Sequence, residues 1–295
     1  MSSNVGFVGL GIMGRPMALN VMKGGHAMAV HARRVASMQP LADAGAVTCA
    51  SPAEVAARSD VTFVMVSDTP DVEQVILGRG GCSEGAKAGA VIVDMSTISP
   101  AATRRVAAAL AEKGIEMLDA PVSGGELGAV NGTLSVMVGG PVQTFERVRP
   151  LLELMGRNIV HIGASGAGQV AKSCNQIVAA VTIEAVAEAL LLAQANGVDA
   201  AKVREALLGG FGYSRVLEIH GRRMLEADFQ PGFKARLHQK DMRIVLQSAF
   251  ELGVALPAAA LAAQHLNALV GSGEGELDSS AIYKVLGRMR RGDDQ

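Results

Sequence analysis

Six residues close to the N-terminus constrain the fold more than any other stretch of this chain. They place three glycines in the spacing G-x-G-x-x-G and are Gly9, Leu10, Gly11, Ile12, Met13 and Gly14. An apolar run at residues 4–8 precedes them, and a helical pattern follows up to residue 24. In this setting the glycines permit a tight turn, a close approach of backbone to a ligand, and close packing of helix on strand. The sequence therefore predicts a turn that holds a dinucleotide pyrophosphate at a helix N-terminus; a glycine turn without a ligand is the alternative.

The end of the next predicted strand, residues 26–31, indicates which dinucleotide is bound. An NAD site usually carries an acidic residue there, which accepts a hydrogen bond from the ribose 2′-hydroxyl. This chain instead has Arg33 and Arg34, and its first acid is Asp43. A guanidinium matches the geometry of a 2′-phosphate, so we expect NADP(H), with NAD(H) still possible. Two solvated arginines at a helix start are the alternative interpretation.

Apolar strands and helices alternate through the first half of the chain. Residues 61–66 and 91–95 are apolar runs typical of buried parallel strands, and helical segments follow both. This alternation predicts an α/β Rossmann domain with a doubly wound, mostly parallel sheet. Because ligands of such sheets bind at the carboxyl ends of the strands, we expect Ser67 and Thr97 to face the cofactor. Both residues also suit helix capping.

A long helix is predicted to begin near residue 165. Residues 169–196 contain neither Pro nor Gly and are rich in Ala, Leu and Val. Only helical patterns follow it. We therefore expect a Rossmann domain at residues 1–164 and an all-helical domain for substrate binding and dimerisation at residues 165–295.

The first turns of this helix carry a cation among apolar residues. Lys172 precedes Asn175 and Gln176 by three and four residues, so all three point from one face. A lysine at the helix rim that reaches water is the simple interpretation. A catalytic amine flanked by two amides is the functional one.

A serine followed by two glycines ends a further predicted strand, residues 116–121. Ser123, Gly124 and Gly125 would expose successive backbone N–H groups, an arrangement suited to a carboxylate. Ser123 as a nucleophile is the alternative, but no His–Asp partnership at a plausible spacing accompanies it.

Composition argues against several classes of protein. Lys and Arg total 27 against 28 Asp and Glu, and Trp is absent, so nothing favours binding to nucleic acid or to an anionic membrane. The three cysteines, Cys49, Cys82 and Cys174, are far apart, which fits a reducing compartment and no metal site. We expect Cys174 to be a buried small hydrophobe. Without a basic leader or an apolar run of about 18 residues, we expect a cytoplasmic protein that does not enter a membrane.

Four blocks of sequence together resemble the β-hydroxyacid dehydrogenase family along nearly the whole chain. They are residues 9–14, residues 119–125, Gly166-x-Gly168 with Lys172 and Asn175, and Lys240-Asp241. The resemblance implies a homodimer or homotetramer that buries the long helix, with Lys172 as the catalytic acid/base. The other implied contacts are Ser123, Gly124 and Gly125 with the substrate carboxylate, Asn175 and Gln176 with the reacting oxygen, and Lys240 with the cofactor.

The resemblance is greatest to the branch that acts on tartronate semialdehyde (2-hydroxy-3-oxopropanoate). We therefore expect its reversible reduction to D-glycerate with NAD(P)H. Alternative substrates are 3-hydroxyisobutyrate, glyoxylate and succinic semialdehyde, and a different class of protein is a non-catalytic NADP-binding module. For Lys240-Asp241, the alternative is a helix-surface ion pair worth under ~1 kcal/mol.

Overall fold

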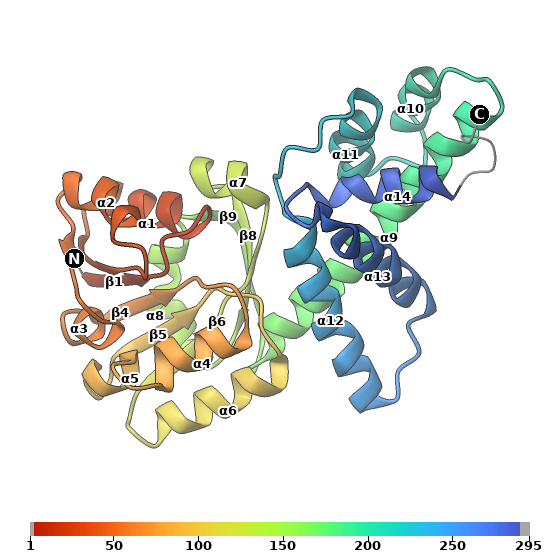
Figure 1. The fold of residues 1–295 in the computed structure, drawn as a ribbon. Helices are drawn as coiled ribbons and strands as arrows, with labels where there is room; N and C mark the ends of the chain where they lie inside the picture. The colour runs from red at the N-terminus through yellow and green to blue at the C-terminus, as the bar shows by residue number, and fades with distance from the viewer. Residues whose placement is uncertain (1–2, 290–295) are drawn as a thin grey trace. The chain divides into compact units, whose positions relative to one another are not determined.

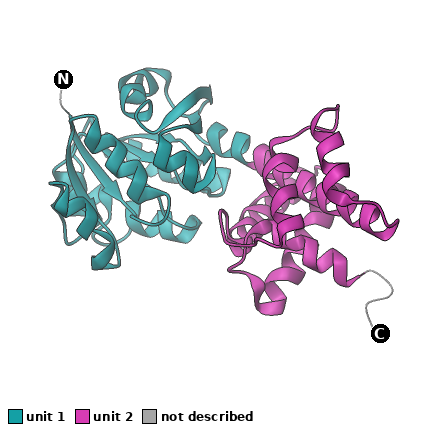
Figure 2. Cartoon of the chain, turned by 90° about the horizontal axis from the view of Figure 1, so that it is seen from above, with its two compact units in different colours: residues 1–172 teal, residues 173–295 magenta. Residues whose placement is uncertain are grey.

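The structure, a computed structural model, describes residues 3–289 and contains two compact units. Unit 1 is Met1–Lys172 and unit 2 is Ser173–Gln295 (Figure 2). The predicted boundary between residues 164 and 165 lies at the start of the long helix, whereas the units divide inside that helix. The physical reason is that the first turns of the helix are hydrogen-bonded to the sheet of unit 1.

Unit 1 is built on a nine-stranded sheet among the described residues. Its order is β3-β2-β1-β4-β5-β6-β8-β7, and β9 pairs with β8. Strands β1 to β6 pair in parallel, β8 is antiparallel to β6 and β7, and β9 is parallel to β8. The predicted, mostly parallel Rossmann sheet is confirmed. The strands are β1 (Asn4–Val8), β2 (Ala27–His31), β3 (Val47–Thr48), β4 (Val61–Val64), β5 (Val91–Asp94), β6 (Glu116–Asp119), β7 (Val122–Ser123), β8 (Leu134–Gly139) and β9 (Gly156–Gly163).

Both faces of this sheet are buried, which explains why its strands have continuous apolar runs. Phe63 belongs to the hydrophobic cluster on one face and its neighbour Val64 to the cluster on the other. Figure 1 shows α1 on one side of the sheet and α4 and α6 on the other. The helices of unit 1 are α1 (Gly14–Lys23), α2 (Gln39–Asp43), α3 (Pro52–Ala57), α4 (Thr69–Leu77), α5 (Cys82–Gly85), α6 (Pro100–Ala111), α7 (Gly125–Asn131) and α8 (Val142–Leu152).

The register brings the carboxyl ends of the parallel strands to one edge. Val8 pairs with His31 on one side and Val64 on the other, and Val64, Asp94 and Asp119 continue the same row. The loops that follow these strands therefore emerge together, as the sequence interpretation of Ser67 and Thr97 requires.

Short elements of unit 1 were not predicted from the sequence. They include β3, α3, α5 and α7, which are too short to show a periodic pattern. A signal for α3 was available, because Ser51 caps it by accepting from the N–H of Glu54, in the S-x-x-E spacing of a capping box.

Unit 2 is helical, as predicted, within the described residues. The long helix α9 (Ala167–Ala195) runs into it, and Ala187 and Leu190 of α9 lie in its core with Leu269. The helix at Ile282–Arg288, α14, was not predicted from the sequence. The other helices are α10 (Ala200–Leu208), α11 (Arg215–Glu226), α12 (Ala235–Leu252), α13 (Pro257–Leu269) and α14 (Ile282–Arg288).

Helix α9 is long and apolar enough, by length and composition, to cross a membrane. The expectation that no segment is long and apolar enough to cross a membrane was therefore wrong for this helix. A core helix of a globular protein meets the same criteria, and α9 contributes Ala180, Ile183 and Val186 to the hydrophobic core of unit 2.

A buried carboxylate organises the loop between α11 and α12. Asp278 is fully buried and accepts hydrogen bonds at both oxygens. Burial raises the pKa of Asp278, but hydrogen bonds from His220, Phe233 and Ser280 outweigh it and hold that pKa well below its usual range. Its partners are the side chains of His220 and Arg223, at 3.3 and 2.9 Å, the N–H groups of Gly232 and Phe233, and the N–H and hydroxyl of Ser280.

We predict that Asp278→Asn lowers the free energy of unfolding of unit 2 by about 3 kcal/mol at pH 7, because it leaves buried donors without their charge partner. A depressed folded-state pKa means that this stability is present above the unfolded pKa of about 3.9 and is lost as pH falls. The difference between the two proteins should therefore shrink below about pH 4.

Urea unfolding followed by tyrosine fluorescence measures this difference. The chain has two tyrosines and no tryptophan, and Tyr213 and Tyr283 both lie in unit 2. Glu226→Gln is the matched control, since it removes only the exposed ion pair with Arg222 on α11. That change should cost under about 0.5 kcal/mol. Equal effects of the two variants would contradict the prediction.

Candidate active site

The three glycines of the first turn play different physical roles. Gly9 has a φ of +96°, and a Cβ there would lie 2.2 Å from the carbonyl oxygen of Met65. A Cβ on Gly14 would lie 2.0 Å from the carbonyl oxygen of Gly9, so the helix and the strand meet too closely for a side chain. At Gly11 a Cβ would meet nothing within 4 Å. Gly11 therefore leaves open space beside the backbone, where a ligand can approach.

The N-terminus of α1 fits the phosphates of a dinucleotide. Its N-cap residue, Met13, makes no side-chain capping hydrogen bond, and its first turn contains no acidic residue. The N–H groups and the positive dipole end of the helix are thus available to an anion.

Two arginines follow the carboxyl end of β2, and they differ in their surroundings. The side chain of Arg33 is 80% exposed and lies 3.4 Å from the carboxylate of Asp71. Arg34 directly precedes a short 3-10 helix at Val35–Ser37. The imidazole of His31, at the end of β2, contacts the carbonyl oxygen of Cys49 at 3.0 Å. Arg33 is thus a long, exposed cation at the end of β2, where the ribose of a bound dinucleotide would lie.

The structure assigns helix capping to the neighbours of Ser67 and Thr97. Asp68 caps α4 and Ser99 caps α6. Ser67 is exposed and Thr97 is half-buried, both just beyond the carboxyl edge of the sheet. The N-cap residues of α4 and α6 are thus Asp68 and Ser99 rather than Ser67 and Thr97.

The Ser-Gly-Gly segment forms the start of a helix. Ser123 is half-buried at the end of β7, Gly124 has a φ of +132°, and α7 begins at Gly125 with a φ of +62°. Two successive positive φ values need glycine. They turn the backbone so that α7 starts two residues after Ser123, with Gly124 as its N-cap residue.

Lys172 lies in the second turn of α9 and is 7% exposed. A lysine at a solvated helix rim would be far more exposed, so the simple interpretation does not describe this residue. In unit 1 the helix starts beside Asp119, whose carboxylate accepts from the N–H groups of Gly166 and Gln169.

In unit 2 a chain of polar contacts joins the remaining predicted residues. The amide nitrogen of Asn175 donates to Gln176 at 2.8 Å, and the amide nitrogen of Gln176 donates to Asp241 at 2.6 Å. The ammonium of Lys240 lies 2.7 Å from the other oxygen of Asp241. The side chains of Lys240 and Asp241 are only 12% and 3% exposed, so they do not form the surface ion pair considered as an alternative.

Asp241 is the residue that the sequence analysis did not assign to the site. It links Gln176 on α9 to Lys240 on α12, across 65 residues of sequence. Its position next to Lys240 in the Lys240-Asp241 motif is the sequence signal that could have identified it as a site residue.

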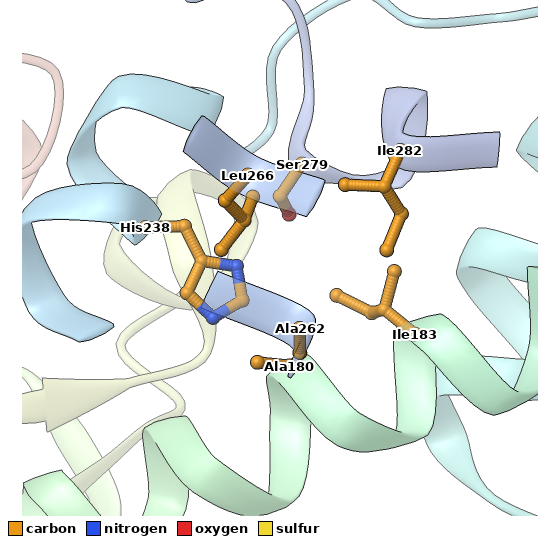
Figure 3. A pocket seen from close by; sticks show the side chains of 7 residues that line it. All are labelled: Ala180, Ile183, His238, Ala262, Leu266, Ser279 and Ile282. Carbon is orange, nitrogen blue, oxygen red and sulfur yellow. The ribbon is translucent and has the colours of Figure 1, made fainter. Parts of the chain in front are cut away.

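Histidines and cysteines contribute no metal site among residues 3–289. His265 pairs with the buried Glu184 at 2.5 Å, and burial raises the pKa of Glu184 although His265 acts in the opposite direction. His238 extends from α12 toward Ala180 of α9, where it lines a gap without room for a water molecule (Figure 3). His238 is buried and His265 is half-buried.

The expectation for Cys174 was wrong, because this residue is exposed. It lies two residues after Lys172, which places it on nearly the opposite side of α9 from the buried Lys172, Gln176 and Ala180.

Comparison with known proteins agrees with this geometry. A family model described as the NAD binding domain of 6-phosphogluconate dehydrogenase matches residues 4–163. A second, described as NAD-binding of NADP-dependent 3-hydroxyisobutyrate dehydrogenase, matches residues 166–286. The chain is 49% identical over 286 residues to the 2-hydroxy-3-oxopropionate reductase of Escherichia coli K12, with 96% of each chain covered. The chain belongs to the β-hydroxyacid dehydrogenase family.

Other members of the family support this assignment. The 3-hydroxyisobutyrate dehydrogenase of Pseudomonas aeruginosa is 37% identical over 96% of this chain and 98% of its own length. The solved structure of Mycobacterium tuberculosis 3-hydroxyisobutyrate dehydrogenase with L-serine gives a TM-score of 0.89 at 33% identity, covering 97% of this chain and 99% of the other. The family predicted from the sequence is confirmed, and the protein is a dehydrogenase with a nicotinamide-cofactor domain.

We predict that Gly11→Ala weakens cofactor binding by at least about tenfold, because a methyl group would fill the space that a pyrophosphate needs. Its melting temperature should stay within about 2 °C of the parent, since the added methyl meets no protein atom. Fluorescence titration with NADPH and NADH, together with thermal unfolding, measures both quantities. Gly14→Ala should instead lower the melting temperature clearly, because its methyl group clashes with the backbone. Unchanged cofactor affinity in Gly11→Ala would contradict the prediction.

Proposed function

We propose that this protein reversibly reduces tartronate semialdehyde to D-glycerate with NAD(P)H. The observation that carries the proposal is its 49% identity, over 96% of both chains, to a relative named 2-hydroxy-3-oxopropionate reductase. The blocks of sequence that resemble this branch of the family point the same way.

In this proposal the nicotinamide supplies the hydride, and the protein orients the aldehyde and manages one proton. The turn at residues 9–14 holds the cofactor phosphates. Lys172 stabilises the negative charge that develops on the aldehyde oxygen and then donates its proton to it. General acid catalysis of this kind contributes about 10²–10⁴-fold to the rate.

The substrate carboxylate is assigned to Ser123, Gly124 and Gly125. The positive φ values of the two glycines support this role, because such a backbone can present successive N–H groups to one anion. Asn175 and Gln176 are assigned to the reacting oxygen. Each amide nitrogen uses one hydrogen within the chain, since Asn175 donates to Gln176 and Gln176 donates to Asp241. The second hydrogen of each NH₂ group is assigned to the reacting oxygen.

A second substrate is supported by the relatives named 3-hydroxyisobutyrate dehydrogenase. One methylene or hydroxyl group changes transition-state binding by only ~1–3 kcal/mol, so small differences in pocket shape decide between such substrates. Measuring NADPH and NADH oxidation with a panel of aldehydes tests the choice. The panel is tartronate semialdehyde, glyoxylate, succinic semialdehyde and methylmalonate semialdehyde, which is the oxidised form of 3-hydroxyisobutyrate. A kcat/KM highest for any compound other than tartronate semialdehyde would overturn the proposed substrate.

For the cofactor we propose a preference for NADP(H). The exposed guanidinium of Arg33 beyond β2 supports it, and no acid directly follows that strand. Lys240 is proposed to contact the cofactor.

We also propose a cytoplasmic homodimer or homotetramer that buries α9. Val178 and Leu192 of this helix are each 66% exposed, and an oligomer would cover them.

Lys172→Ala should lower kcat by at least about 10²-fold, because the developing oxyanion loses its proton donor. The affinity for NADPH should stay within about threefold, since the pyrophosphate turn is unchanged. Stopped-flow or steady-state absorbance at high enzyme concentration measures kcat, and fluorescence titration measures affinity. The exposed Lys202→Ala on α10 serves as the control and should retain full activity. Near-normal turnover by Lys172→Ala would remove the proposed mechanism.

Replacing Arg33 and Arg34 together by Ala should raise the KM for NADPH by about tenfold or more, because a 2′-phosphate loses its charge-assisted hydrogen bonds. The KM for NADH should change less than about threefold. Arg58→Ala, which removes an exposed arginine paired only locally with Glu54, is the matched control. Parallel shifts in both KM values would show that these arginines do not recognise the phosphate.

A further inference from the structure

The start of α9 is held by a residue from a different element. Asp119, the last residue of β6, is 1% exposed. Its Oδ1 accepts from the N–H of Gly166 at 2.8 Å and its Oδ2 accepts from the N–H of Gln169 at 3.0 Å. N–H groups at a helix start have no partner within the helix. A single carboxylate therefore caps α9 and ties it to the end of a central strand.

A second contact ties the same turn to the loop after β5. The side chain of Gln169 is fully buried. Its Oε1 accepts from the N–H of Ile98 at 3.1 Å, and its Nε2 donates to the carbonyl oxygen of Ser96 at 2.8 Å. The amide group of Gln169 thus acts as both donor and acceptor toward the same loop. That loop also contains Thr97, which is assigned to the cofactor.

The packing around these contacts leaves no room for adjustment. A Cβ on Gly168 would lie 2.4 Å from the carbonyl oxygen of Met137 and 2.7 Å from that of Asp119. A Cβ on Gly139 of β8 would lie 2.5 Å from the carboxylate of Asp119. Two glycines thus allow the helix to lie directly on the ends of β6 and β8, so that the helix start has one position.

Lys172 follows Gln169 by three residues on the same continuous helix, so the position of its Cα is set by this anchor. Burial raises the pKa of Asp119 against the opposing effect of the N–H groups of Gly166 and Gln169. The fold therefore keeps an ionisable side chain where burying a non-ionisable one would cost less. Such a cost is expected where geometry matters, because a misplacement of about 1 Å can lower a rate by 10²-fold.

We propose that Asp119 and Gln169 are positioning residues that set the location of the Lys172 amine by fixing the first turn of α9 to the carboxyl edge of the sheet. This inference rests on the proposed role of Lys172 as the proton donor. Neither residue is assigned a contact with the substrate.

The test compares Asp119→Asn, Lys172→Ala and the double variant. Asn keeps the size of the side chain but presents an NH₂ group to one backbone N–H, so one of the two anchoring bonds is lost. We expect kcat to fall by about 10- to 100-fold in Asp119→Asn. The KM for the nicotinamide cofactor should stay within about threefold. In the Lys172→Ala background, Asp119→Asn should cause no further loss, because residues that act through one group are not additive.

Two results would overturn the inference. One is an unchanged kcat in Asp119→Asn. The other is a double variant whose rate falls by the product of the two single effects, because Asp119 would then act independently of Lys172. Near-normal turnover in Lys172→Ala alone would instead refute the proposed function, so the two failures are distinguishable.

Thr144→Val is the matched control, because it removes a partly buried hydrogen bond at the opposite end of the same strand. The hydroxyl of Thr144 donates to Glu116, the first residue of β6. This variant should lower the melting temperature without changing kcat. An equal loss of kcat in Thr144→Val would show that Asp119→Asn lowers kcat through a general loss of stability, and not through the position of Lys172.

Gln169→Glu provides a second variant should Asp119→Asn fail to fold. It keeps the acceptor for the N–H of Ile98 but replaces the donor to the carbonyl oxygen of Ser96 by an acceptor. We expect the same loss of kcat and the same absence of additivity with Lys172→Ala. Full activity of a folded Gln169→Glu would contradict the proposal for Gln169.

Discussion

The parallel register of β1, β2, β4, β5 and β6 is the constraint on which the site in unit 1 depends. It places Val8, His31, Val64, Asp94 and Asp119 in one row, so the chain leaves every strand at the same edge. Residues far apart in sequence then share a small region without any direct attraction between them. The edge is also where helix N-termini begin, and their dipoles make it suitable for phosphates and carboxylates.

Glycines at this edge separate the requirements of packing from those of binding. Gly14 and Gly168 are positions where a Cβ would collide with backbone oxygen atoms, so the fold itself excludes a side chain there. Gly11 is surrounded by open space and meets no such exclusion. The same residue type thus closes a helix onto a strand at two places and leaves room for a ligand at a third. Sequence spacing alone cannot separate these roles, because they depend on what lies opposite each Cα.

Buried charge in unit 2 follows one rule throughout. Asp241 lies between Gln176 and Lys240, and Asp278 accepts from several donors. Glu184 has His265 beside it. Each carboxylate has a partner that is distant in sequence and lies on a helix: Gln176 for Asp241, Arg223 for Asp278 and His265 for Glu184. Such pairs hold helices in one arrangement, because an unpartnered charge in the same place would be strongly destabilising.

The amino-acid sequence by itself determined the Rossmann sheet and the helical second half. These follow from local patterns: continuous apolar strands, the glycine turn at residues 9–14, and the absence of Pro and Gly from residues 169–196. The family followed from the resemblance of four sequence blocks, whereas the shortest strands and helices left no pattern to read. Only the tertiary structure decided that Asp119 caps α9, that Asp241 joins Gln176 to Lys240, and that Cys174 is exposed. The reason is physical, since a hydrogen bond or a buried face depends on which elements pack together, and that information is not contained in the spacing of residues along one element.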